Sequence, residues 1–153
     1  MLIINQKRND IKLQTGCISF ISLNSTKNDG FEIITNVDIP PKTKVHFTDS
    51  EWNGNHFGFD ENDITWFTGE KIIKAKSLIR FTNLNSNASV SVGTLKGSMK
   101  ISKKEDAIFA YLGDKRMPDI FLAAIANIEL GYGTLMNTGL IDGETAIIYR
   151  GGK

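Results

Sequence analysis

The sequence predicts an all-β protein folded as an antiparallel β-sandwich. Many short segments rich in β-branched and aromatic residues are separated by Gly, Asn, Asp and Pro turn signals. No regular helices alternate between these segments, which is the pattern of sandwiches and barrels rather than of α/β folds. Only residues 119–128 admit a helix, because a continuous apolar run has no period to decide by. We therefore expect at most one short helix and favour a strand there.

Length and composition predict one domain. The chain has 153 residues, of which 41% are hydrophobic and 23% charged, as in ordinary globular proteins. A chain of this size buries roughly two-thirds of its unfolded surface, so it needs no metal or disulfide to hold a core. We assign residues 1–15 to a lead-in segment, with an edge strand over 11–13, and residues 16–150 to a single sandwich domain.

The stretch 24–52 organises the first half of the chain. A polar loop, 24–30, is rich in residues that form turns, and residues 31–35 have the apolar, β-branched character of a half-buried strand. Pro40 and Pro41 remove two successive backbone donors, so that strand ends before them. Strands are also predicted over residues 17–23, 45–47 and 64–68, with a long acidic and aromatic loop, 48–63, between the last two.

The second half repeats this arrangement. Residues 77–82 alternate between two faces, and residues 106–112 form the strongest strand pattern of this half. Glycines at 131, 133 and 139 predict an irregular stretch before the last strand. The remaining strand candidates are residues 90–92, 99–101, 118–129 and 144–149.

Charge and hydropathy argue against several partners. The formal net charge of +1 gives no electrostatic reason to expect nucleic acid or an anionic membrane. No stretch approaches the ~20 apolar residues of a membrane helix, so no membrane insertion is expected. The apolar run at the start is too short for a secretory signal peptide. Cys17 is the single cysteine, so it forms no intrachain disulfide and is expected to be a buried apolar residue.

A series of short motifs resembles a β-sandwich domain of bacterial secreted and surface proteins. Those domains read G-D-I-A-F, D-G-F-x-F, D-I-P-x-G-T, F-T-D-x-G-W and L-T-W-T in this order. The matching segments here are residues 16–20, 29–31, 38–43, 47–52 and 64–66, followed by weaker matches to residue 149. Lys42 and Glu51 stand where glycine is usual. The resemblance implies a secreted or cell-surface location and a non-catalytic role.

Three segments more distantly resemble the lamin-tail domain, an immunoglobulin-like sandwich. Residues 31–36 are similar to its E-F-I-E-L-x-N block, residues 73–83 to its I-P-P-G-x-Y-L-V-L-T-N strand, and residues 101–106 to its L-S-N-x-G-D turn. This likeness implies two sheets packed face to face. Neither family implies a catalytic centre.

The residues give little support for catalysis. The chain has no G-x-S-x-G motif, no glycine loop for phosphate and no His/Cys spacing suited to zinc. Of the two histidines, His46 lies within a strand and is expected to be structural. His56 lies near Asp60 and Glu61, so a hydrolase that uses His56 with Asp60 or Glu61 is one alternative function.

The loop 48–63 allows two kinds of binding site and one structural interpretation. Its acidic residues Asp49, Asp60 and Asp63 offer oxygen ligands of the kind that calcium takes, without the spacing of an EF-hand. Alternatively, large aromatic side chains suit a surface that binds a sugar or a peptide. In the structural interpretation, some of these aromatics close one end of the sandwich. The candidate ligand-binding residues are Trp52, His56, Phe57, Phe59 and Trp66.

The favoured hypothesis is a non-catalytic interaction or adhesion module without a cofactor. It would bind a protein or surface ligand through the end loops 48–63 and 83–89, because loops on a rigid scaffold carry most binding functions. The first alternative is a carbohydrate-binding module that uses the loop aromatics to hold a glycan. The hydrolase is the second alternative.

Overall fold

The computed structural model describes residues 13–25, 28–58, 62–101, 107–127 and 132–150. In these residues the chain forms ten strands and no helix, so the predicted all-β class is confirmed. The strands pack as two layers with a shared core. They are β1 (Ile18–Asn24), β2 (Gly30–Thr35), β3 (Lys44–Thr48), β4 (Asp63–Phe67), β5 (Leu78–Thr82), β6 (Ser89–Val90), β7 (Thr94–Gly97), β8 (Ala107–Asp114), β9 (Met117–Ala126) and β10 (Ala146–Ile148).

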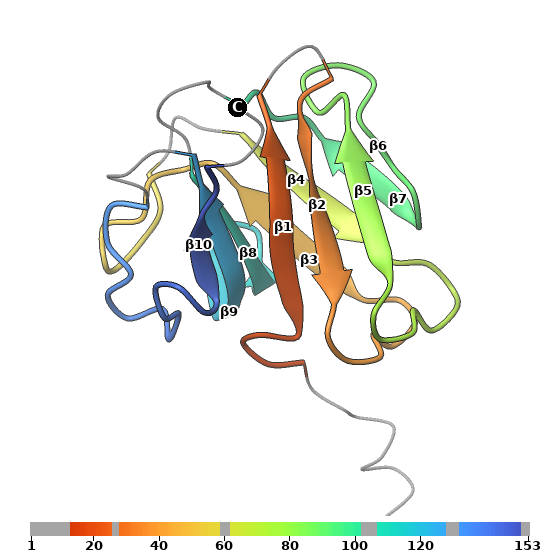
Figure 1. Ribbon diagram of the computed structural model, residues 1–153, viewed down its shortest axis with the longest axis horizontal. Coiled ribbons are helices and arrows are strands. Elements are labelled where there is room, and N and C mark those ends of the chain that lie inside the picture. Colours follow the sequence, from red (N-terminus) through yellow and green to blue (C-terminus); the bar gives the residue numbers. More distant parts are fainter. Residues whose placement is uncertain (1–12, 26–27, 59–61, 102–106, 128–131, 151–153) are drawn as a thin grey trace, which may run out of the picture.

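The two sheets face each other as a sandwich. The smaller sheet has the strand order β1-β2-β5-β6, and the larger has the order β10-β9-β8-β3-β4-β7. Figure 1 shows the smaller sheet in front of the larger one. All pairs are antiparallel except β10 with β9, which are parallel. The predicted antiparallel sandwich is thus confirmed with one parallel pair, which the sequence does not indicate, because the direction of a short apolar strand leaves no pattern in its residues.

Aromatic side chains fill the space between the sheets. The Phe31 ring stacks on Phe81 of the neighbouring strand, with centroids 4.6 Å apart, and contacts Phe47 of the opposite sheet at 4.9 Å. Trp66 meets Phe81 edge to face at 5.4 Å. Each of these residues comes from a different strand. Ile33 and Ile79, two positions from Phe31 and Phe81 on their strands, belong to the same core, because every second side chain of a strand points to one face.

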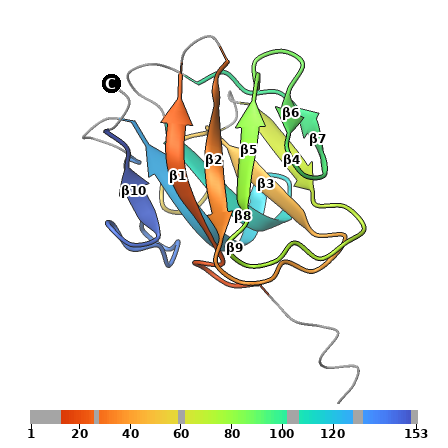
Figure 2. The ribbon, with the colours of Figure 1, turned by 45° about the vertical axis from the view of Figure 1, so that its right-hand side comes forward.

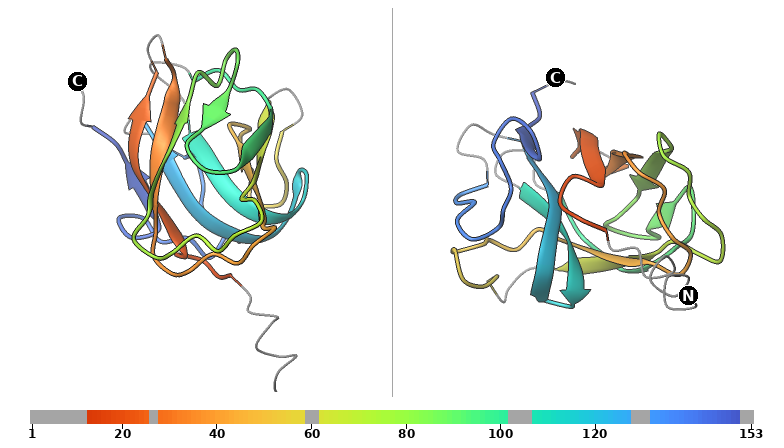
Figure 3. Two further views of the ribbon diagram at one scale, coloured as in Figure 1. Left: turned by 90° about the vertical axis from the view of Figure 1, so that its right-hand side faces the viewer. Right: turned by 90° about the horizontal axis from the view of Figure 1, so that it is seen from below.

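Residues 119–128 form no helix in the part that the structure describes, and the favoured strand is confirmed. Strand β9 pairs with β8 along its length, and the two make a long curved hairpin (Figures 2 and 3). Ala123 and Ile125 face the smaller sheet, whereas Phe121 and Ala124 lie on the outer face. The continuous apolar run thus reflects a strand that is covered on both sides.

A second apolar cluster covers this outer face. Two irregular segments fold over the larger sheet and bury its outward side chains: the loop 49–62, in its described residues 49–58, and the connection 132–145 between β9 and β10. A parallel pair requires a long crossover, and the connection 132–145 is part of that crossover. The buried members of this outer layer are Trp52, Phe57, Phe109, Tyr111, Phe121, Ala124, Ala126, Tyr132, Leu140 and Ala146.

Two other predictions differ from the structure. Residues 99–101 form no strand, and β7 lies before them instead. Met99 and Ile101 are nevertheless buried, held by Met99 N–H to Leu84 O at 2.8 Å and Ile101 N–H to Asp29 Oδ2 at 3.2 Å. In the edge strand predicted over 11–13, residues 11–12 lie outside the described residues and Leu13 is not in a strand. Leu13 belongs to the core, so the packed chain includes residues that the sequence pattern assigns to the lead-in.

Candidate functional site

The described part of the loop 49–62, residues 49–58, lies folded back on the outer face of the larger sheet. The loop leaves at the end of β3 and returns at the start of β4, as the sequence predicts. Trp52 is 5% exposed and its Nε1–H donates to Met136 O at 2.8 Å. Phe57 pairs with Trp52 across the loop and packs its ring on Tyr111 at 5.4 Å and Phe121 at 5.8 Å. These two aromatic residues anchor the loop.

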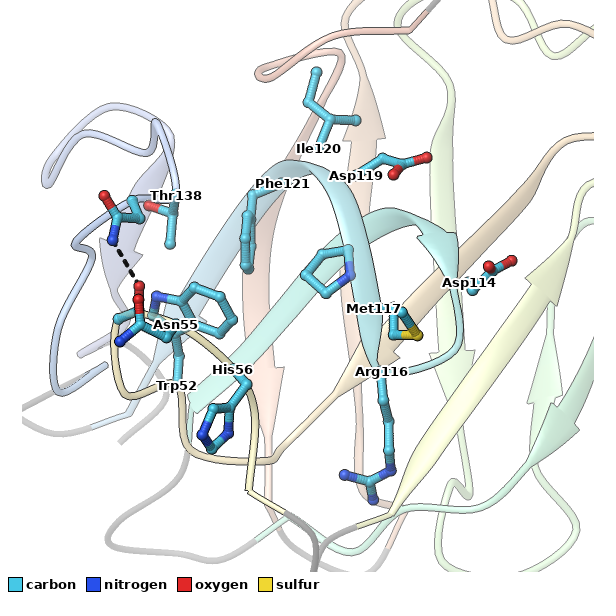
Figure 4. Close-up of a pocket in the computed structure, with 13 residues that line it drawn as sticks. Trp52, Asn55, His56, Asp114, Arg116, Met117, Asp119, Ile120, Phe121 and Thr138 are labelled. Atoms are coloured by element: carbon cyan, nitrogen blue, oxygen red, sulfur yellow. Dashed lines mark hydrogen bonds between the residues drawn. The ribbon is translucent and has the colours of Figure 1, made fainter.

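The connection 132–145 forms a second wall beside this loop. Gly133 makes a bridge with Trp52, and Asn137 Nδ2–H donates to Gly54 O at 2.7 Å (Figure 4). Asn137 has a φ of 63°, in the left-handed region that Asn tolerates better than most residues. Backbone contacts and one amide side chain therefore hold the two irregular segments side by side.

The turn of the β8–β9 hairpin forms the third wall. Arg116 occupies this turn with a φ of 66°, and its N–H donates to the Tyr111 hydroxyl oxygen at 2.7 Å. Its guanidinium reaches across to the loop, where Nη1 donates to Gly58 O and to Ser50 Oγ at 3.4 Å. Its Nε lies 3.6 Å from Oδ2 of Asp63. Arg116 thus connects the hairpin, the loop and strand β4.

A pocket of about 630 Å³ with an open mouth lies between these three walls. Its volume is within the ~300–1,000 Å³ range of sites that hold ligands. Figure 4 shows Trp52 and Phe121 close together, with the carboxylates of Asp114 and Asp119 directed away from them. The lining residues are Trp52, Gly54, Asn55, His56, Asp114, Arg116, Met117, Pro118, Asp119, Ile120, Phe121, Asn137 and Thr138.

Gly113 permits the bend that brings the hairpin turn to this position. Its φ is 126°, and a β-carbon there would lie 2.6 Å from Asp119 N and 2.7 Å from Met117 O. The pairing of β8 with β9 shifts register at this glycine. A side chain at this position would collide with the backbone of β9, so glycine is required for the close approach.

Polar side chains under the pocket are buried and paired. His46 on β3 is 7% exposed and stacks on Tyr111 with ring centroids 5.2 Å apart. Its Nε2 lies 3.0 Å from Gly113 O, which can only accept, so this nitrogen carries the proton and Nδ1 accepts from the Thr65 hydroxyl at 3.0 Å. Burial lowers the pKa of His46 and raises that of Tyr111 to about 12. Both groups are held in their neutral forms.

The predicted ligand-binding residues separate into three groups. Trp52 and His56 line the pocket, and Phe57 is buried directly against it. Trp66 lies instead in the core between the sheets with 0% exposure, and its Nε1–H donates to Val92 O at 2.8 Å. The prediction that Trp66 binds a ligand is therefore corrected, because a ligand cannot reach its side chain. Phe59 lies outside the described residues.

The candidate calcium ligands are not gathered in the described structure. Asp49 Oδ1 accepts from Asn62 N–H at 3.3 Å, and Asp63 is buried with Arg116 as its ion-pair partner. Asp60 lies outside the described residues. Within the described ranges, no group of three or more His, Cys, Asp or Glu side chains is placed to hold a metal ion.

The pocket lining offers little for covalent chemistry. It contains neither serine nor cysteine, and its one hydroxyl, on Thr138, donates to Leu135 O at 2.7 Å and accepts from Leu140 N–H at 3.0 Å. His56 Nδ1 lies 3.1 Å from Phe57 O. The two carboxylates predicted to act with His56, at positions 60 and 61, fall outside the described residues.

Much of this site is not predicted from the sequence. The loop residues were found through their aromatic and acidic composition. The sequence predicts only a turn at Arg116, followed by Met117 and Pro118, and an irregular stretch around Asn137. The local sequence feature that marks this turn is the Met-Pro pair directly after Gly113-Asp114-Lys115-Arg116.

Comparisons of the chain with family models, with curated proteins and with solved structures found no significant match. In the part of the chain that the structure describes, no helix is long and apolar enough to cross a membrane.

Proposed function

We propose that this protein is a non-catalytic interaction module that binds a segment of a partner protein in the pocket between the loop 49–62, the β8–β9 turn and the connection 132–145. The observation that carries the proposal is the pairing of a preformed pocket with exposed apolar side chains. Met117 lines it with 68% exposure, and Met136 lies beside it with 62%. Methionine and aromatic residues are enriched at protein interfaces, where a flexible thioether adapts to its partner.

The same geometry favours a protein ligand over a glycan. A sugar-binding platform presents the face of an aromatic ring to solvent, but Trp52 is 5% and Phe57 2% exposed. Their rings support the pocket from below. The end loop 83–89, the second loop expected to bind, lies on the other side of the molecule from the loop 49–62 (Figures 1 and 3). We therefore assign binding to the first loop alone.

The immunoglobulin-like and lamin-tail-like relationship, the adhesion role and the secreted or surface location remain parts of this proposal. They are supported by the order of the sequence motifs between residues 16 and 149 and by the two facing sheets. Calcium binding by Asp49, Asp60 and Asp63 remains a prediction of the sequence.

Selection from a phage-displayed random peptide library tests the proposal. The immobilised wild-type protein should enrich apolar peptides that the Met117→Glu variant fails to retain, because the new carboxylate opposes apolar contact at the pocket. The matched control is Ile72→Glu, which places the same charge at a 52% exposed apolar position outside the pocket lining. Peptides that bind both variants equally well would show that the pocket is not the binding site.

A further inference from the structure

Two of the four methionines in the chain border the pocket with their side chains exposed. Methionine is usually a buried residue, as Met99 is here with 1% exposure. Met117 and Met136 are, by contrast, the two most exposed large apolar side chains in the described structure. The exposure of both side chains beside one pocket therefore differs from the burial that is usual for methionine.

The two thioethers belong to different walls. Met117 begins β9 directly after the hairpin turn and lines the pocket, and Figure 4 shows it on the side away from Thr138. Met136 belongs to the connection 132–145, and its carbonyl accepts the Trp52 indole N–H. Its Sδ lies 3.5 Å from where a β-carbon on Gly54, a lining residue, would stand. Met117 therefore lines the pocket directly, and Met136 packs against a residue that lines it.

Exposed thioethers react with peroxides. A lone pair on the methionine sulfur attacks one oxygen of hydrogen peroxide, the O–O bond breaks, and the sulfur gains that oxygen while the remainder leaves as water. The sulfur loses two electrons and the peroxide gains them. The product, methionine sulfoxide, is polar and disrupts apolar interfaces, and dedicated reductases restore the thioether.

We infer that Met117 and Met136 are modification sites through which a peroxide controls the pocket: oxidation of the pair to sulfoxides makes its apolar border polar and releases the partner. The release step rests on the proposed function, whereas the oxidation itself rests only on the exposure of the two sulfurs. Met99 serves as an internal control because it has the same chemistry inside the core.

The first test is a time course of the folded protein in hydrogen peroxide, followed by proteolysis and mass spectrometry of the methionine peptides. The first oxygen atoms should appear on Met117 and Met136 while Met99 remains unmodified. Oxidation of Met99 at the same rate as the other two, or persistent thioethers at position 117 or 136, would overturn the assignment.

The second test measures the affinity of a peptide selected on the wild-type protein, by fluorescence anisotropy before and after oxidation. Oxidation should weaken binding by roughly tenfold, because apolar contact is lost on two sides of the pocket. A Met117→Leu/Met136→Leu double variant should bind like the reduced wild type and should not respond to peroxide. Treatment of the oxidised wild type with methionine sulfoxide reductase should restore binding.

The outcomes separate this inference from the proposed function. A peptide whose affinity is unchanged by oxidation, or falls equally in the double leucine variant, overturns the control by methionine and leaves the binding site standing. If the wild type selects no peptide at all, the proposed function fails and the release step fails with it. The prediction that Met117 and Met136 are oxidised before Met99 is then tested by the masses of the methionine peptides alone.

Discussion

His46 is a buried polar residue on the outer face of the larger sheet. His46 is enclosed by Thr65, Gly113 and Tyr111, and both of its ring nitrogens have partners. A buried imidazole of this kind is stable only in its neutral form, because protonation would place a charge in a poorly hydrated site and break the bond that Nδ1 accepts.

His46 should therefore make the protein less stable as the pH falls. Burial depresses its folded-state pKa below the ordinary 6.5, so its contribution is present above pH 6.5 and is lost as the pH falls through the folded-state value. Urea unfolding at about pH 7.5 and pH 5.5, on either side of the ordinary histidine pKa, should show a smaller loss of stability in His46→Gln than in the wild type. A titration midpoint for His46 above 6.5, measured by NMR, would contradict this interpretation.

The ion pair between Arg116 and Asp63 should contribute more to the stability of the fold than its N–O distance of 3.6 Å suggests. Asp63 has no exposed side-chain surface and its oxygens have no hydrogen-bond partner, so Arg116 is its compensating charge among the described contacts. Removal of one partner from a buried pair costs on the order of 3 kcal/mol because the other charge remains. Arg116→Met should show this loss in denaturant unfolding, and Asp63→Asn in the same chain should recover part of it. Additive effects of the two changes would show that the residues are not coupled.

At the scale of elements, the turn between β2 and β3 has a backbone strained by its sequence. Lys42 has a φ of 60°, where the bacterial sequence pattern has glycine, and its N–H donates to Gly69 O at 2.6 Å. The left-handed region costs an L-residue about 1 kcal/mol, and more if it is β-branched. Glu51, the other departure from that pattern, has no positive φ.

Substitutions at position 42 should follow this conformational preference. We expect the free energy of unfolding to decrease in the order Lys42→Gly, wild type, Lys42→Val, over a range of roughly 2 kcal/mol. Chemical denaturation measures the order. Glu70→Gln is the control for the exposed ion pair at 3.7 Å that Lys42 makes, which should contribute less than about 1 kcal/mol. A valine variant as stable as wild type would show that the turn is not strained.

The strands were predictable where one physical signal dominated. Residues 31–35 and 77–82 alternate or contain β-branched residues between turn signals, and β2 and β5 lie there. The apolar run before Asn127 was ambiguous because β9 is covered on both faces, which removes the alternation. Residues 99–101 were predicted as a strand because apolar Met99 and Ile101 alternate with Lys100, but the backbone N–H groups of Met99 and Ile101 donate to Leu84 O and to the Asp29 side chain.

The site was predictable only in part because it depends on distant contacts. The aromatic composition of the loop 49–62 indicated a binding or anchoring role, and Trp52 and Phe57 do anchor it. Trp66 is also a large aromatic residue close to the loop in sequence, but its position in β4 places its side chain in the core between the sheets. The contribution of Arg116 and Met136 follows from contacts across 58 and 84 residues of sequence. Local patterns contain no information about such pairs.

At the scale of the whole molecule, two apolar layers share one sheet. The core between the sheets contains the Phe31, Phe47 and Phe81 cluster, and the outer layer contains Trp52 and Phe57 with the two irregular segments. Segments that have few strand pairings open more readily than strands, so the outer layer should have the lower local stability.

Two phenylalanine variants should separate these layers. Phe47→Ala should cost roughly 3–5 kcal/mol and increase hydrogen exchange throughout the protein, because it leaves a cavity between the sheets. Phe57→Ala should increase exchange mainly in the loop 49–62 and the connection 132–145, while the strands of the smaller sheet remain protected. Hydrogen-exchange mass spectrometry reads both patterns. A uniform increase in the Phe57 variant would mean that the outer layer is inseparable from the core.

The most direct measurement of the binding site is the map of backbone amide chemical shifts on titration with a selected peptide. The proposed pocket predicts that the largest changes fall on three segments distant in sequence, residues 52–56, 114–121 and 136–138, with Trp52 Nε1–H among them. Changes confined to the loop 83–89 or to the exposed face of the smaller sheet would contradict the assignment of the pocket as the binding site.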